Sequence, residues 1–180
     1  EYFYLKTRSQ TDADVGEMLS EKKFEELVNA MDILHISLLD QSCIYKLLSA
    51  ILFCGNVEFE PDFKQTEEDG SKVTVAEPLE TSASLLEVDV HFLTQALTSV
   101  SIGTRSVIYI PYNVDQACGA RDAMCKHVYS RLFDWLIGKI NATLDVGSTE
   151  EVNCLNVLDI FGFECFNLNS FEQLCINYCN

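Results

Sequence analysis

Apolar residues recur at the spacing of an α-helix along four stretches of this chain. Positions i, i+3, i+4 and i+7 lie on one face of a helix, and polar residues cover the other face. This pattern predicts amphipathic helices over about 21–34, 44–52, 82–98 and 114–143. Gly55 follows the second of these, where we expect a left-handed C-terminal cap. The long stripe of the fourth helix is more typical of a core contact than of a binding face.

A short strand and an acidic loop are expected after the second helix. Val57 and Phe59 alternate with glutamates, and we expect Pro61 to end the strand. Residues 56–80 hold eight Asp and Glu against two Lys, with few large apolar groups. This composition predicts a solvated surface loop.

Three further elements are expected later in the chain. The β-branched and aromatic run 106–111 predicts an exposed hairpin or extended loop over 102–113. Residues 155–161 are mostly apolar and end at a glycine, which predicts a buried strand. Ser170 and Gln173 then have the spacing of a capping box, and the helix they open carries apolar residues at helical spacing, namely Phe171, Leu174, Cys175 and Tyr178. The chain ends within this helix, so we expect an internal fragment of a larger protein.

Composition and charge narrow the classes of function. At 180 residues and 48% hydrophobic, the chain can bury a real core. Its net charge of −16 argues against a nucleic-acid partner. No apolar run approaches the roughly 18 residues of a membrane span, so we expect no transmembrane segment. The eight cysteines lack metal-knuckle spacing and predict free thiols in a reducing compartment, with those in apolar segments packed as small hydrophobes: Cys43, Cys54, Cys154 and Cys175.

The end of the predicted strand 155–161 carries the clearest chemical signal. Asp159 is followed three positions on by Gly162, a D-x-x-G arrangement. A carboxylate at the C-terminal edge of a strand can hold Mg²⁺ through its waters, and a glycine lets a backbone N–H approach a phosphate. Any strand-to-turn junction can supply these residues, so a turn with a solvated aspartate is the alternative.

The longer string around this motif resembles switch II and the relay helix of the myosin motor domain. It reads Leu-Asp-Ile-Phe-Gly-Phe-Glu over 158–164 and Asn-Ser-Phe-Glu-Gln-Leu-Cys-Ile-Asn-Tyr over 169–178. Residues 129–136 are similar to the long helix before switch II, and 48–59 to an earlier helix and strand. The resemblance covers about residues 2–180. It implies one central segment of a P-loop NTPase-type motor, a helix-rich α/β fragment with several amphipathic helices, one buried switch II strand and an exposed hairpin.

The resemblance also implies roles for single residues near the end of the chain. Asp159 would bind the water shell of Mg²⁺. The expected catalytic residues are Gly162, whose amide would contact the γ-phosphate of ATP, and Glu164, which would pair with an arginine of switch I. Phe171 and its relay neighbour Glu172 would pass the switch II movement to the lever.

The predicted hairpin is similar to a loop of the family that contacts actin, in a form closer to unconventional than to muscle myosins. The expected contact residues are Ser106, Val107, Ile108, Tyr109, Ile110 and Pro111. Sixteen residues before Asp122 of the string Asp-Ala-Met-Cys-Lys, the family has an acidic or phosphorylatable residue. That position is Ser106, so regulatory phosphorylation is expected there, with an unmodified exposed serine as the alternative.

Taken as a whole, the resemblance implies part of an ATP-hydrolysing motor of the cytoplasmic actin cytoskeleton. ATP and Mg²⁺ would be the cofactors, and the actin filament and the rest of the motor domain the partners. The sequence holds no G-x-x-x-x-G-K-[ST] phosphate loop and no switch I segment, so the chain alone is expected to be inactive. After Lys139 it holds no Lys or Arg, so the cations that balance Asp159 and Glu164 must come from elsewhere. A non-catalytic myosin-derived fragment and a helical interaction module unrelated to nucleotides stay open as alternatives.

Overall fold

The computed structural model describes residues 2–5, 21–63, 70–103, 107–145, 159 and 162–179. Its elements, in chain order, are the 3₁₀ turn η1 (Phe3–Leu5), α2 (Glu21–Ile33), α3 (Leu38–Gly55), β1 (Phe59–Asp62), β2 (Gly70–Val73), α4 (Ala76–Leu86), α5 (Val90–Thr98), β3 (Ser99–Ile102), β4 (Ile108–Pro111), α6 (Val114–Leu144) and α7 (Phe171–Cys179). Of the predicted strand 155–161, all residues except Asp159 lie outside the described residues.

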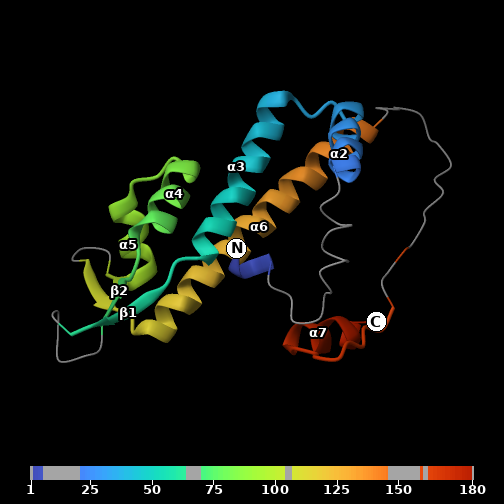
Figure 1. Ribbon diagram of the computed structural model, residues 1–180. Helices are drawn as coiled ribbons and strands as arrows, with labels where there is room; N and C mark the ends of the chain where they lie inside the picture. The colour runs from blue at the N-terminus through green and yellow to red at the C-terminus, as the bar shows by residue number, and fades with distance from the viewer. Residues whose placement is uncertain are drawn as a thin grey trace.

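Helices α3 and α6 run side by side through the body of the molecule (Figure 1). Helices α4 and α5 pack at one end of this pair, next to the strands, and α2 lies at the other end (Figure 1). Helix α7 stands apart from them (Figure 1). The arrangement places the strands and α7 at separate sites around a common helical body.

The larger hydrophobic core lies where α3, α4, α5 and α6 meet. Its buried members are Cys54, Val57, Leu79, Ala83, Leu93, Leu97 and Cys125. The one polar side chain among these helices that is fully buried, Ser82, donates a hydrogen bond of 3.0 Å to the carbonyl oxygen of Ala50 on α3. This bond lets α4 approach α3 closely without leaving a buried hydroxyl unsatisfied.

A second, smaller core joins α2 to α3 and to the later half of α6. Its buried members are Met31, Ile36 and Ile44, with Leu132 and Leu136 packed against them. The predicted stripe on α6 is therefore partly a core face, as expected. Trp135 of the same stripe is exposed instead, with the Lys139 ammonium 5.3 Å from the ring centroid.

The described strands form two separate antiparallel pairs, β1 with β2 and β3 with β4. In the first pair Pro61 lies opposite Ser71, inside the strand that it was expected to end. Because the pair has only two strands, a proline N lacking hydrogen can face away from the partner. Strand β1 overlaps the short strand expected before Pro61. The rest of the stretch 56–80 was predicted as a loop, and β2 and the first turns of α4 within it are a correction to that prediction.

The helix predicted over 82–98 is two helices. Glu87 has a left-handed φ of 57° and ends α4, and Asp89 then caps α5 by accepting a hydrogen bond of 2.7 Å from the His91 amide. Leu93 and Leu97 of α5 and Leu79 of α4 still reach the same core. The helical spacing of apolar residues continues across this break, so the sequence pattern did not reveal it.

Gly55 is not the left-handed cap that its position suggested. The cap is Asn56, with φ of −87°, and Gly55 is the last residue of α3. A Cβ at Gly55 would lie 2.5 Å from ring atoms of Tyr4 in η1. The glycine is therefore required by close packing, and not by backbone conformation.

Among the described helices, α3 alone has the length and apolar composition of a membrane span, with a mean hydropathy of 1.3. The helix meets this criterion on average, although Asp40 and Lys46 interrupt its apolar residues. Helix α3 nevertheless packs against α4 and α6, and the core helix of a globular protein meets the same criterion. The absence of a transmembrane segment stays a prediction.

Candidate functional site

The structure describes all three residues of the predicted phosphate-sensing site: Asp159, Gly162 and Glu164. Asp159 and Gly162 are exposed, and Glu164 is half-buried. A Cβ built at Gly162 would meet no described atom within 4 Å, so the side of the residue where a side chain would lie is open. A ligand could approach the residue on that side, which is the role of a glycine at a phosphate contact.

Asn177 of α7 binds the peptide backbone of Glu164 from both sides. The Glu164 amide donates to Asn177 Oδ1 at 2.7 Å, and Asn177 Nδ2 donates to the Glu164 carbonyl at 2.7 Å. Both groups are partly buried, so the two bonds are partly shielded from competing water. They connect the segment that follows Gly162 directly to the last helix, a link that the sequence analysis missed.

A similar pair of bonds precedes α7. Asn169 accepts from the Phe166 amide at 3.0 Å and donates to the Phe166 carbonyl at 2.8 Å. The predicted capping box at Ser170 forms only in part: the Ser170 amide donates to Gln173 Oε1 at 2.8 Å. The Ser170 hydroxyl lies 2.5 Å from the Glu172 carboxylate, and this hydrogen bond lowers the pKa of Glu172.

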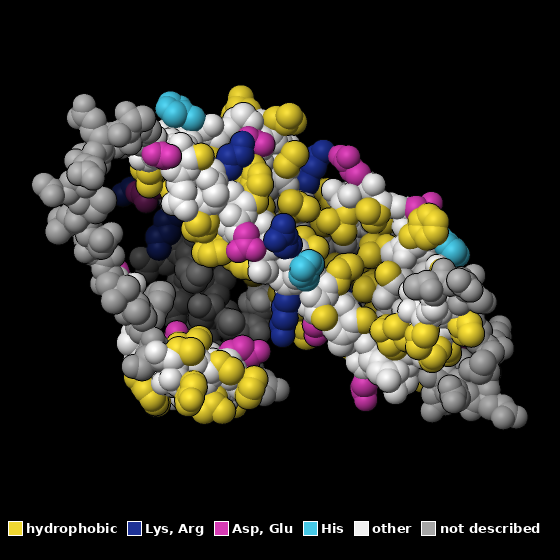
Figure 2. Space-filling model, turned by 180° about the vertical axis from the view of Figure 1, so that it is seen from behind, with side chains coloured by type: hydrophobic (Ala, Val, Ile, Leu, Met, Phe, Trp, Pro, Cys, Tyr) yellow, Lys and Arg dark blue, Asp and Glu magenta, His cyan; other side chains and the backbone are white. Residues whose placement is uncertain are grey.

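Helix α7 exposes the apolar face that its sequence predicts. Phe171 is 75% exposed and Tyr178 89% exposed, and Leu174 and Cys175 between them are also exposed. Figure 2 shows these yellow side chains gathered on the lobe that α7 forms. Lys126 of α6 lies 4.0 Å from Glu172, a long and exposed ion pair. The packing role expected for Cys175 is wrong within this chain, and so is that of Cys43, which is also exposed.

The exposed hairpin is confirmed and is longer than predicted. It comprises β3 and β4, with Ile102 opposite Ile108 and Ser99 opposite Pro111. Val107, Ile108, Tyr109 and Ile110 are exposed, and Pro111 is half-buried. Ser106 lies outside the described residues. The tip of the molecule therefore presents apolar side chains to its surroundings, whereas a solitary domain normally covers such a patch.

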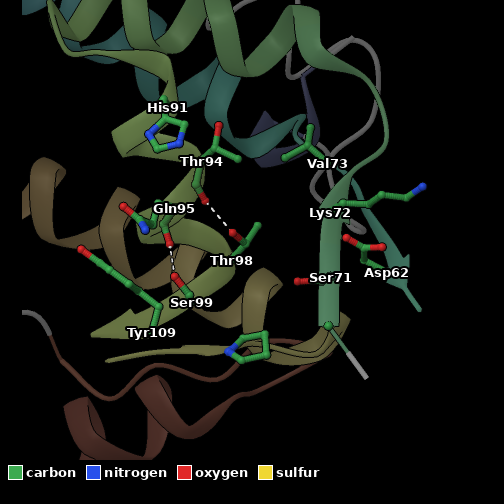
Figure 3. A pocket seen from close by; sticks show the side chains of 12 residues that line it. Asp62, Ser71, Lys72, Val73, His91, Thr94, Gln95, Thr98, Ser99 and Tyr109 are labelled. Atoms are coloured by element: carbon green, nitrogen blue, oxygen red, sulfur yellow. Dashed lines mark hydrogen bonds between the residues drawn. The ribbon is translucent and has the colours of Figure 1, made fainter. Parts of the chain in front are cut away.

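A polar cleft of about 290 Å³ separates the two strand pairs from α5 (Figure 3). Ser71 projects from β2 into it, and its buried hydroxyl has no hydrogen-bond partner among the described residues. The Thr98 and Ser99 hydroxyls on the opposite wall donate to the carbonyls of Thr94 and Gln95, at 2.9 and 2.8 Å. These two bonds leave the oxygens of the hydroxyls able only to accept from a ligand.

A partly buried ion pair between Arg121 and Asp122 organises a hydrogen-bond network at α6. Arg121 is 7% exposed, and its Nε and Nη2 both lie 2.8 Å from Asp122 Oδ1. Its Nη1 donates to the carbonyl of Val57 at 2.8 Å, and the Tyr4 hydroxyl donates to the same Asp122 oxygen at 2.6 Å. Burial raises the pKa of Tyr4, so it stays a hydrogen-bond donor. This network joins three distant parts of the sequence.

The described residues can be compared with the ligand sets that metal ions need. Within the described residues, no group of three or more His, Cys, Asp and Glu side chains could hold an ion. Asp159 is a single exposed carboxylate, which suits an indirect contact with Mg²⁺ through water and not a complete ligand set.

Comparison with known proteins assigns the family. The model of the myosin head (motor domain) matches residues 1–180. Myosin-1 of Emericella nidulans is 38% identical over 183 residues, Myosin-1 of Coprinopsis cinerea 39% over 183 and Myosin-1 of Pyricularia oryzae 40% over 181. These matches cover 98%, 98% and 99% of this chain and 14% of each relative. Since the family model spans the whole chain, this polypeptide belongs to the myosin head (motor domain) family, of which it represents a helix-rich fragment.

Proposed function

We propose that this chain is the central part of an ATP-hydrolysing, actin-based motor. In this proposal residues 159–164 act as switch II, α7 begins the relay helix, and the β3–β4 hairpin contacts actin. The main support is the pair of bonds between Asn177 and Glu164, because it connects the segment that follows Gly162 with a helix whose apolar face is exposed. Such a motor works in the cytoplasm, on the actin cytoskeleton.

The residues present fit part of a nucleotide site. The Gly162 N–H would donate to the γ-phosphate, and Asp159 would hold a water of the Mg²⁺ shell. Bound Mg²⁺ would supply charge neutralisation for the phosphates. Glu164 would pair with an arginine outside this chain, and the groups that grip the α- and β-phosphates would also come from outside it.

Coupling to the rest of the motor would run through Asn177. If the peptide at Gly162 moves toward a phosphate, the Glu164 peptide two residues later moves with it. Asn177 binds the backbone N–H and the backbone carbonyl of Glu164, each at 2.7 Å, so α7 must move with Glu164 or lose both hydrogen bonds. Phe171 and Glu172 at the start of α7 would then pass the movement on.

Gly162→Ala in the intact motor tests the proposed site. A methyl group at the phosphate contact should lower single-turnover hydrolysis at least about a hundredfold, as loss of a transition-state donor does, and leave ATP binding nearly unchanged. Quenched-flow and fluorescent-nucleotide binding separate the two steps, and Gly138→Ala on α6 is the matched control, since its Cβ would also meet no described atom. Equal losses in binding and hydrolysis would refute the assignment. Absence of turnover in the intact wild-type protein would favour the non-catalytic alternative.

Regulation at Ser106 is a further part of the proposal. A phosphate on Ser106 would add about −1.5 to −2 charges in the sequence between β3 and β4. Residues 101–145 hold five basic and four acidic side chains, so this change would reverse the sign of their net charge. Ser106→Glu and Ser106→Ala motors should differ in actin-activated turnover at low salt and match without actin. Identical activation curves would leave Ser106 an unmodified surface serine.

A further inference from the structure

Two cysteines from different helices meet inside the larger core. Cys54 lies near the end of α3 and Cys125 near the middle of α6, and they belong to the same buried cluster. Cys54 is 1% exposed and Cys125 4% exposed. Both thiols are free, and both residues border the same very small internal cavity. None of the roles proposed above uses this pair.

The two thiols differ in their access to solvent. Cys125 lines an apolar groove of about 600 Å³ between α3 and α6, next to Tyr4 and Tyr129. Cys54 does not line this groove and lies behind Cys125, where both border a very small internal cavity beside Ser82. A molecule the size of water that enters the groove would therefore meet Cys125 first.

The surroundings also favour the thiolate form of Cys125. The hydrogen bond from Cys54 lowers the pKa of Cys125 to about 7, against the opposing effect of burial, and the Tyr4 hydroxyl adds to the lowering. The other charged groups nearby are Arg121, which lowers this pKa, and Asp122, which raises it. Thiolates, and not thiols, react with peroxides, so Cys125 suits the role of the attacking cysteine.

We propose that Cys54 and Cys125 form an oxidation site that a hydroperoxide converts to a disulfide between α3 and α6. The Cys125 thiolate attacks one peroxide oxygen, the O–O bond breaks, and the released hydroxide takes up a proton to become water. Cys54 then attacks the sulfur of the resulting sulfenic acid, and the second water leaves with the Cys54 proton. Two thiols and one hydrogen peroxide give one disulfide and two waters.

The first experiment maps the disulfide by mass spectrometry. The folded protein is treated with hydrogen peroxide, denatured, alkylated and digested without reduction. The Cys54–Cys125 linked peptide should exceed any other linkage about tenfold, since among the described cysteines only this pair combines a lowered pKa with a buried partner. Cys54→Ala and Cys125→Ala should abolish it. Cys43→Ala, which removes an exposed thiol from the same helix as Cys54, should leave it unchanged.

The second experiment tests the order of the two cysteines and controls for folding. Dimedone traps sulfenic acids, and it should label Cys125 in the Cys54→Ala protein but not Cys54 in the Cys125→Ala protein. Peroxide treatment of the wild-type protein in urea should remove the preference for this pair. Labelling of Cys54, or absence of the linked peptide at peroxide levels that oxidise Cys43, would overturn the proposal.

Discussion

The helical body and the α7 region are built on different principles. Five residues of α3 are buried, and two hydrophobic cores hold it against its neighbours. Helix α7 has no buried residue, and its apolar face is exposed. What organises α7 is a set of side-chain amides and caps that bind the preceding backbone, led by Asn177 and Asn169. Burial thus fixes the body, whereas polar bonds orient α7 and leave its apolar face exposed.

The largest effect of this difference is expected for a pair of leucine truncations. Leu97 is 1% exposed in the core and Leu174 is 63% exposed on α7. Leu97→Ala should lower the free energy of unfolding by about 3 kcal/mol, through lost burial and a new cavity. Leu174→Ala should change it by less than about 0.5 kcal/mol. Urea unfolding followed by circular dichroism measures both, and similar losses would mean that α7 is packed like the body.

A pair of glycine substitutions sharpens the account of the body. Gly55→Ala places a Cβ 2.5 Å from the Tyr4 ring and should cost about 2 kcal/mol, because the ring must move from its site. Gly138→Ala on α6 meets no described atom within 4 Å and should raise stability by about 0.5–1 kcal/mol. The same unfolding measurement applies. A neutral Gly55→Ala would show that η1 is not docked on α3.

The smallest expected effect concerns the link between the proposed switch segment and α7. Asn177→Ala removes both bonds to Glu164, and a loss of about 1 kcal/mol corresponds to roughly fivefold faster hydrogen exchange of the Glu164 amide. The Phe166 amide, which Asn169 holds, should be unaffected and serves as the internal control. Unchanged exchange at Glu164 would remove the physical basis of the coupling proposed above.

Hydrophobic spacing predicted the main helices well, because their buried faces repeat over several turns. It failed where local chemistry decided the backbone. Spacing continues across Glu87, so one helix was predicted where a left-handed residue separates two. The acidic stretch 56–80 was expected to be a loop, although its strands are short and pair with each other. Gly55 was explained by the wrong property, because the ring that requires it lies 51 residues earlier, as the numbering of Tyr4 shows.

The candidate site was predicted from a short sequence motif, and not from the periodic spacing of apolar residues. Asp159, Gly162 and Glu164 follow from one short string, whereas Asn177 was passed over as a helix residue. Its signal in the sequence is weak, a single amide between Ile176 and Tyr178. The Cys54–Cys125 contact could not be predicted either, since nothing in the spacing of two cysteines 71 residues apart, by their numbering, shows that their helices cross there.

The network around Arg121 also sets an order of events during synthesis. Tyr4 lies among the first residues of the chain, and its partner Asp122 follows 118 residues later. At about 5–20 residues per second, translation takes on the order of ten seconds to cover that interval. Throughout this time the Tyr4 hydroxyl lacks its acceptor, whereas Phe3 can bind Asn56 once residue 56 has been made. The beginning of this chain is thus among the last parts to reach its final place, and a ribosome that pauses before residue 122 leaves it unfinished.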